Sequence, residues 1–364
     1  MRRRVALVLL LFGLLLCSGA PAVFAVADPV PALGVAVATG APPLPLDVTA
    51  TSFLVADLNT GEIWAAKDEH RRLLPASTLK VLTALALIPR VARDTVVVPT
   101  VDDVEADGTR VGIIENDSYP AYQLFRAMLM TSGNDAANAL ARAAGGRSEV
   151  ARFMNDAARR AGALDTVADN PSGLDAPGQT TTAYDLALIA RAAMRLPDFR
   201  AYVATKRSSI NGRRGRPLFI ASHDKLLYNY PGAIGIKNGY TVKAGATFIG
   251  AATRGGHTLL VTVLHARARV WPEVAHLLDW GFAAESAAAG PLGRLPDPPA
   301  VRSPLQVRAG TAPRQLLAQR GTGTSSPRPP LTVAAGVAAL AALAVARHRF
   351  RSRHRPARPS RNAT

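Results

Sequence analysis

The sequence predicts a mixed α/β (α+β) domain, with one antiparallel sheet flanked by helices and an all-helical subdomain inserted between its strands. Two apolar segments, 52–56 and 63–66, flank the turn Asn59-Thr60-Gly61 and predict a hairpin. Two more strand patterns occur much later, at 247–252 and 258–265. Helical patterns rich in Ala and Leu occupy about 76–88, 120–130, 134–144, 147–161, 182–195 and 272–282. Because strands come early and late, we expect distant segments to pair across the helical middle.

The formal net charge of +17 over 364 residues is concentrated at the two ends. Arg2 to Arg4 and the seven arginines of 347–364 have no acidic residue among them, which leaves +7 for the residues between. Basic residues at the two ends of a chain, next to apolar segments, indicate how the chain is targeted to and oriented in a membrane. Nucleic-acid binders interleave basic and aromatic residues, and aromatic residues make up only 5% of this chain. We therefore expect no nucleic-acid partner.

The first 27 residues have the pattern of a cleaved signal peptide. Three arginines precede the apolar run Val5–Cys17, and Ala25-Val26-Ala27 supplies a cleavage site before Asp28. Cys17 is the single cysteine and would leave with the signal. The mature chain is therefore expected to have no thiol nucleophile, thiolate metal site or disulfide.

The remaining chain divides by composition. Residues 28–47 are rich in Pro, Ala and Val and are interpreted as a linker before a folded domain over 48–285. Residues 286–330, rich in Pro, Arg and Ser, are interpreted as a stalk. The uncharged residues 331–346 are expected to form a transmembrane helix of about 24 Å. The basic tail 347–364 is then cytoplasmic by the positive-inside rule. The pattern predicts an exported domain with a single C-terminal membrane anchor.

Ser77 and Lys80 lie three residues apart at the start of a predicted helix, in Ser77-Thr78-Leu79-Lys80. That spacing places both side chains on one helix face. A serine hydroxyl needs a base to become a nucleophile, and a desolvated neutral lysine can be that base. One such pair arises easily by chance among six lysines, so on this motif alone a surface lysine near a helix start is the better explanation.

Two further motifs add chemistry. In Ser132-Gly133-Asn134, between two predicted helices, the serine could relay a proton and the asparagine could bind a substrate amide; a helix cap is the alternative. In Lys237-Asn238-Gly239, a cation and a glycine on an edge strand suit an anionic ligand lying along the backbone. A charged edge strand with a turn is the alternative there.

The order S-x-x-K, S-x-N and K-x-G resembles the motif set of penicillin-binding proteins and β-lactamases. From about Thr51 to Phe282 the sequence is similar to the serine D-alanyl-D-alanine carboxypeptidases of the low-molecular-mass penicillin-binding type, peptidase family S11. The similarity also covers the segments 57–62, 75–80, 132–137, 170–175, 182–187 and 278–282. It implies a β-lactamase/transpeptidase-like fold and a catalytic domain over 48–285.

The resemblance implies a role for each motif residue. Ser77 would be the acylated nucleophile and Lys80 its general base, while Ser132 would pass the proton to the leaving D-alanine. Asn134 would hold the peptide amide, and Lys237 would attract the terminal carboxylate and lower the pKa of Lys80. The remaining implied site residues are Asn238, Gly239 and Thr241 on the substrate-binding strand, and the backbone N–H groups of Ser77 and Tyr240 as the oxyanion hole.

The same resemblance implies peptidoglycan peptide stems as substrate and β-lactams as covalent inhibitors, with no cofactor and no metal. The seven histidines form no HExxH pattern or clustered ligand pair. His223 is interpreted as a turn residue that could line the cleft. Asp175 and Asp185 are interpreted as a turn residue and a helix-entry residue that support the site.

Two departures from the family pattern and three alternatives accompany this interpretation. Asn238 stands where threonine or serine is usual, and 286–330 is too short for the β-rich domain of many relatives. A β-lactamase of the class with the most similar motifs needs a glutamate for deacylation, and none lies between Glu149 and Glu273; we therefore expect a long-lived penicilloyl enzyme. An endopeptidase on cross-linked peptidoglycan and a non-catalytic wall-binding protein remain open.

Overall fold

The computed structural model describes residues 34–300. The predicted signal peptide at 1–27, most of the stalk, the membrane segment 331–346 and the basic tail lie outside the described residues. Within 34–300, no helix has the length and apolar character required to cross a bilayer.

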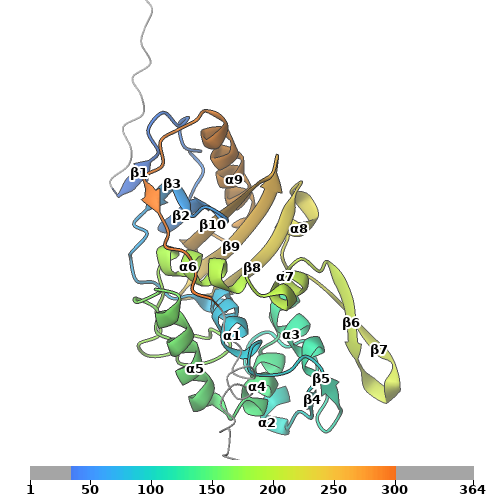
Figure 1. The fold of residues 1–364 in the computed structure, drawn as a ribbon. Coiled ribbons are helices and arrows are strands. Elements are labelled where there is room, and N and C mark those ends of the chain that lie inside the picture. Colours follow the sequence, from blue (N-terminus) through green and yellow to red (C-terminus); the bar gives the residue numbers. More distant parts are fainter. Residues whose placement is uncertain (1–33, 301–364) are drawn as a thin grey trace, which may run out of the picture. The chain divides into compact units, whose positions relative to one another are not determined.

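The predicted antiparallel sheet is confirmed, and distant segments meet at its centre (Figure 1). Its strand order is β1-β3-β2-β10-β9-β8, with β11 also paired to β3. The central pair joins β2 to β10, with Val55 opposite Val261. The strands are β1 Val35–Val37, β2 Ser52–Asp57, β3 Glu62–Lys67, β8 Ala233–Thr241, β9 Gly245–Arg254, β10 His257–Ala266 and β11 Gly293–Arg294.

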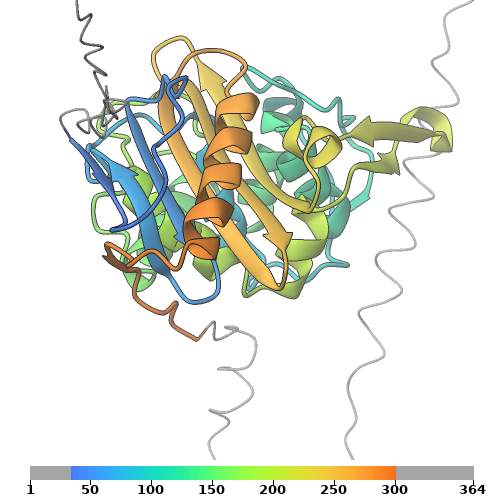
Figure 2. The same cartoon turned by 90° about the horizontal axis from the view of Figure 1, so that it is seen from above.

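The helices cover both faces of the sheet, so the central strands are apolar on both sides. In β2 all six residues are buried: Val55 packs toward α9, and Leu54 faces the core of the inserted helices. Figure 2 shows α9 across one face and the helices of the inserted half behind the sheet, whereas Leu226 of α8 packs in the same cluster as α9. The helices are η1 Ala76–Leu79, α1 Lys80–Leu87, α2 Val101–Val104, α3 Ala121–Met130, α4 Asn134–Ala143, α5 Arg147–Arg160, α6 Ala183–Ala193, α7 Pro197–Val203, α8 Leu226–Asn229 and α9 Trp271–Ser286.

The structure differs from the expected linker and stalk where the chain enters and leaves the domain. Residues 35–37 of the expected linker form β1, which pairs with β3. Residues 293–294 of the expected stalk form β11, which pairs with β3 as well. Leu295 is buried, and its carbonyl accepts a hydrogen bond from the Arg191 guanidinium at 3.1 Å. Strands of two and three residues are too short to show a period of two, so composition dominated the interpretation.

The sequence also did not reveal two hairpin-like pairs in the helical half. A short pair joins β4 Val96–Val97 to β5 Tyr119–Pro120, and a longer hairpin joins β6 Arg207–Asn211 to β7 Pro217–Ala221. The expected edge strand around Lys237 is β8, which closes one side of the sheet. Its position beside η1 brings the third motif to the first.

Candidate active site

The turn at 76–79 carries Ser77, the expected nucleophile, and is called the nucleophile turn below; it begins directly after Pro75 and is held from two sides. Ala76 has φ +47°, a left-handed conformation that costs energy in a residue with a Cβ. The hydroxyls of Thr78 and Thr247 both donate to the Pro75 carbonyl, at 2.6 and 2.9 Å. This anchoring fixes Ser77, whose side chain remains partly exposed beside β8.

Lys80 is fully buried one turn after Ser77, and its amine has three neighbours. Nζ lies 3.0 Å from Ser77 Oγ, 2.6 Å from Asn134 Oδ1 and 2.5 Å from the Ser172 carbonyl. The amide and carbonyl oxygens only accept, so they use both N–H groups of a neutral amine. Nζ is also placed to donate to Ser77 Oγ. Once the amine is neutral, its lone pair is the group left to take the Ser77 proton, as a general base requires.

The charge state of Lys80 agrees with that geometry. Burial lowers the pKa of Lys80 well below its ordinary value, and the charge of Lys237 lowers it further. The carboxylate of Asp135 acts in the opposite direction. Burial is the largest effect, so the amine is neutral at a pH where an exposed lysine is protonated.

The second motif, residues 132–134, lies at the junction between the end of α3 and the start of α4. Ser132 is buried with φ +62°, and Asn134 begins α4. The Asn134 side chain accepts from Lys80 and donates through Nδ2 to the Asp107 carbonyl at 2.6 Å. Both ends of this amide are therefore bonded within the protein, whereas the sequence analysis expected it to hold a substrate amide. In the free protein Asn134 acts on Lys80.

Asp135 fixes the loop that covers the second motif. Its buried carboxylate accepts from the backbone N–H groups of Val111, Gly112 and Ile113 at 3.0, 2.8 and 3.2 Å. The same carboxylate stands close enough to affect Lys80. The Asp135 carboxylate therefore both orders this loop and raises the pKa of Lys80.

Lys237 is fully buried on β8. Its Nζ donates to the Asn238 carbonyl at 2.6 Å and to Asn238 Oδ1 at 3.3 Å. Burial lowers the pKa of Lys237 to about 7, although the Asp224 carboxylate opposes the shift. An incoming carboxylate would favour the charged form of this lysine. Farther along the strand, the Thr241 hydroxyl donates to Asp175 Oδ1 at 2.9 Å.

Gly239 is required where β8 passes the nucleophile turn. A Cβ at this position would lie 2.5 Å from Thr247 Oγ1, 2.7 Å from Ser77 N and 3.0 Å from Thr78 N. The backbone of β8 is therefore in direct contact with the backbone of the turn that carries Ser77. The following residue, Tyr240, has an exposed side chain.

The loop at 170–173 supplies the Ser172 carbonyl to Lys80, a contact that the sequence did not predict. Asn170 Oδ1 accepts from Ser172 N at 3.2 Å, Ser172 Oγ at 2.8 Å and Gly173 N at 2.8 Å. A Cβ on Gly173 would meet the Ala76 carbonyl at 1.9 Å. The loop therefore lies directly against the nucleophile turn. Its contribution comes from a backbone atom, for which the residue type gives no signal.

Asp224 is the second residue that the sequence analysis missed. Its carboxyl is buried, accepts from Leu226 N at 2.8 Å, and has one oxygen without a hydrogen-bond partner among residues 34–300. Burial raises the pKa of Asp224 to about 6, against the opposing effect of Lys237. It acts as the counter-charge of Lys237 from a neighbouring segment.

The other side of β8 borders a cavity of about 630 Å³. Asn238 and Tyr240 line it together with three basic residues, His223, Lys225 and Arg269. The cavity lining includes no acidic residue. His223 lines this cavity, and burial followed by the charge of Lys237 lowers its pKa.

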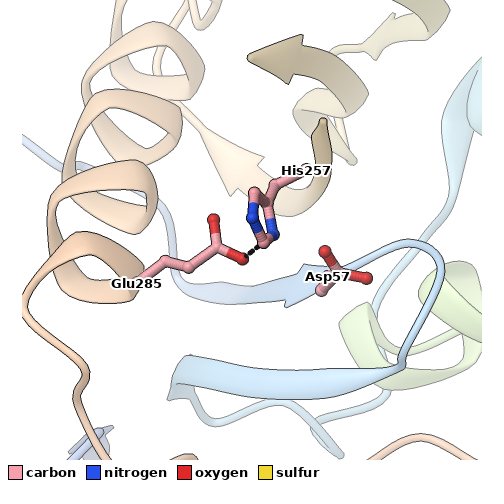
Figure 3. Close-up of side chains that lie close together, drawn as sticks. All are labelled: Asp57, His257 and Glu285. Atoms are coloured by element: carbon pink, nitrogen blue, oxygen red, sulfur yellow. Dashed lines mark ion pairs between the residues drawn. The ribbon is translucent and has the colours of Figure 1, made fainter. Parts of the chain in front are cut away.

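One group of side chains in the described part of the chain could hold a metal ion: Asp57, His257 and Glu285 (Figure 3). His257 Nδ1 lies 2.5 Å from Glu285 Oε1, so the group already forms an ion pair when the histidine is protonated. His257 is paired with Arg254 at the far end of β9 from Thr247. The group therefore lies away from Ser77 and takes no part in its chemistry.

A partly exposed serine, a buried lysine with a lowered pKa beside it and a second buried lysine on the edge strand define a serine acyl-transfer site of the penicillin-binding and β-lactamase class. The model of the peptidase S11 family, described as D-alanyl-D-alanine carboxypeptidase, matches residues 36–268. The chain belongs to this family.

Similar proteins support that assignment. D-alanyl-D-alanine carboxypeptidase DacB2 of Mycobacterium tuberculosis is 41% identical over 257 residues, which cover 69% of this chain and 88% of the relative. A crystal structure of the D-alanyl-D-alanine carboxypeptidase from M. tuberculosis H37Rv is 41% identical in sequence, with a TM-score of 0.66. The match covers 68% of this chain and 96% of that chain. The crystal structure of the Streptomyces K15 DD-transpeptidase is 27% identical in sequence, with a TM-score of 0.63. The match covers 66% of this chain and 100% of that chain.

Proposed function

We propose that this chain is a serine-type D-alanyl-D-alanine carboxypeptidase that removes the terminal D-alanine of peptidoglycan pentapeptides through an acyl-Ser77 intermediate. The observation that carries the proposal is the 3.0 Å contact between Ser77 Oγ and the fully buried Lys80, whose pKa is lowered by that burial. Family membership supports the same reaction and the same substrate class.

In the acylation step, Lys80 takes the hydroxyl proton while Ser77 Oγ attacks the carbonyl carbon of the penultimate D-alanine. The negative charge on the carbonyl oxygen is assigned to the backbone N–H groups of Ser77 and Tyr240. Ser132 passes the proton to the leaving amine as the peptide bond breaks. Water then attacks the ester, which releases the shortened peptide and regenerates Ser77.

Substrate binding is assigned to β8. Lys237 attracts the terminal carboxylate, and Asn238, Gly239 and Thr241 line the strand beside it. Asn134 is assigned to the substrate amide once binding displaces one of its two internal contacts. A carboxylate next to Lys237 raises the pKa of that lysine, so the bound complex holds a charged Lys237 near a neutral Lys80.

The wall-acting family points to an extracytoplasmic enzyme. We infer further that 1–27 is a cleaved signal peptide and that 331–346 anchors the domain, on the sequence pattern alone. Membrane fractionation of the full chain and of a chain ending at 330 tests the anchor. Release of only the shorter chain into the soluble fraction supports it.

The test of the reaction is D-alanine release from a diacyl-Lys-D-Ala-D-Ala tripeptide by the full chain, beside Ser77→Ala. Release by the wild type alone is expected. A folded wild type that binds penicillin covalently but releases no D-alanine would favour the endopeptidase alternative. A protein that does neither would favour a non-catalytic wall-binding protein.

A further inference from the structure

The β6–β7 hairpin carries most of the excess positive charge of the domain. Residues 206–222 contain Lys206, Arg207, Arg213, Arg214 and Arg216 and no acidic residue. Residues 34–300 contain 28 Lys and Arg and 25 Asp and Glu, so the five charges of the hairpin exceed the net charge of +3 of that whole segment. Figures 1 and 2 both show the hairpin projecting from the body of the domain.

One face of the hairpin is fixed to the protein. Ile210 and Ile220 are buried at neighbouring positions. Asn211 N donates to Gln123 Oε1 of α3 at 2.8 Å, and Gln123 Nε2 donates back to Asn211 Oδ1 at 3.1 Å. The protein therefore supports the hairpin along its buried face and, through Asn211, at the tip end of β6, while residues 207, 209, 219 and 221 on the other face, called the free face below, remain exposed.

The free face combines cations with an aromatic ring. Phe219 is 80% exposed, opposite Ser209, and Arg207 lies on the same face two residues before Ser209. Arg213, Arg214 and Arg216 are exposed at the tip. An exposed large aromatic ring between guanidinium groups is a feature of interaction surfaces.

The five basic side chains make no hydrogen bond or ion pair with any residue of 34–300. Several arginines elsewhere on the surface do have carboxylate partners, as Arg152 has in Glu149 at 2.5 Å and Arg142 in Asp103 at 2.7 Å. Like charges on one hairpin repel each other, and an external anion removes that repulsion. The guanidinium plane matches the geometry of a carboxylate.

The base of the hairpin is joined to the catalytic motifs. Directly after it, His223 N donates to the Met130 carbonyl at 2.8 Å, two residues before Ser132. The next residue is Asp224, the counter-charge of Lys237. A polymer bound along the hairpin would therefore run past the cleft.

We propose that the free face and tip of the β6–β7 hairpin form a docking surface for polymeric peptidoglycan, whose peptide stems carry free carboxylates. The proposal rests on the proposed function, because it names the polymeric form of the same substrate. Binding of the polymer at the hairpin raises the concentration of neighbouring stems at Ser77. A soluble tripeptide is too short to reach both places.

The experiment removes the tip charges from the full chain with Arg213→Gln, Arg214→Asn and Arg216→Gln. Asparagine is chosen at 214 because φ there is +56°, where asparagine is favoured over most residues. The matched control removes three exposed arginines on or near other helices, with Arg147→Gln, Arg160→Gln and Arg195→Gln. Both triple variants lose the same net charge.

The readouts are co-sedimentation with insoluble purified peptidoglycan and D-alanine release from the tripeptide. The tip variant is expected to bind the polymer roughly tenfold more weakly, whereas the control binds like the wild type. Wild-type binding should weaken as salt rises from about 50 to about 500 mM. Tripeptide turnover should stay within about twofold in both variants, because the tip does not contact Ser77.

Equal polymer binding by the tip variant and the wild type would overturn the proposal. Vesicles of phosphatidylglycerol are tested in the same way. A tip variant that binds peptidoglycan like the wild type but no longer binds these vesicles would also overturn the proposal, because it would assign the surface to lipid. An absence of tripeptide turnover in the wild type would refute the proposed function instead. Co-sedimentation does not depend on turnover, so the two failures are distinguishable.

Discussion

Replacing Gly239 by alanine tests whether β8 and the nucleophile turn must be in direct contact. The new Cβ would lie 2.7 Å from Ser77 N, whereas ordinary contacts begin near 3.4 Å. Strand and turn must therefore separate by about 0.7 Å, the difference between these distances. The nearest atoms include two backbone nitrogens, which cannot rotate away as a side chain can.

A shift of that size acts on Ser77 and on Lys237 in the same strand. Misplacement by about 1 Å costs roughly 10²-fold in rate, so we expect acylation by penicillin to slow by about that factor. Overpacking should also lower the free energy of unfolding by about 1–3 kcal/mol. The assay is the second-order rate constant for labelling by a fluorescent penicillin, with urea denaturation for stability.

The matched control is Gly293→Ala on the edge strand β11. No atom lies within 4 Å of a Cβ at this position, and its φ is not positive. We expect wild-type labelling and stability from this variant. If Gly239→Ala were labelled as fast as Gly293→Ala, the inferred backbone contact between β8 and the turn would be wrong.

The charged residues around Ser77 give three more predictions. Lys80→Met should slow penicillin labelling by roughly 10³-fold or more while circular dichroism remains native, because the base is lost; labelling near the wild-type rate would exclude Lys80 as the base. In the free enzyme, kcat/KM should fall above about pH 7 as Lys237 loses its proton. Asp224→Asn should move that fall to lower pH, because the Asp224 carboxylate raises the pKa of Lys237, and an unchanged pH profile would refute the coupling. Asp135→Asn weakens the acceptor of three backbone N–H groups, so urea denaturation should show a loss of about 2–4 kcal/mol; an unchanged midpoint would contradict this.

The long elements and the motif residues were predictable because they leave signals in residue type and spacing. The hairpin at 52–66, the strands β9 and β10, and the pairing of Ser77 with Lys80 follow from periods and offsets. Strands β1 and β11 did not, because two or three residues give no period. Their pairing with β3 is decided by tertiary contacts.

At the site, sequence reasoning failed where the contribution is made by backbone atoms or depends on burial. The Ser172 carbonyl binds Lys80 whatever side chain residue 172 carries. Asp224 resembles an ordinary turn residue until its burial and its effect on Lys237 are known. The hydrogen bond from Lys80 to the Asn134 oxygen in the free protein was not predicted either, because it depends on how α1 and α4 pack.

The coexistence of two buried lysines in one site follows from their different partners. Lys80 is held by oxygen atoms of Asn134 and Ser172 that accept from a neutral amine, whereas Lys237 has the Asp224 carboxylate to favour its charged form. Each lysine is thereby suited to a different task, proton transfer for one and anion binding for the other.

The acyl-Ser77 intermediate is tested most directly by mass spectrometry of the full chain after incubation with benzylpenicillin. The expected result is one penicilloyl adduct per chain, mapped to the peptide that contains Ser77, absent in Ser77→Ala and still present long after free penicillin is removed. An adduct on another residue, or no adduct on a folded wild-type chain, would contradict the assignment of Ser77 as the nucleophile.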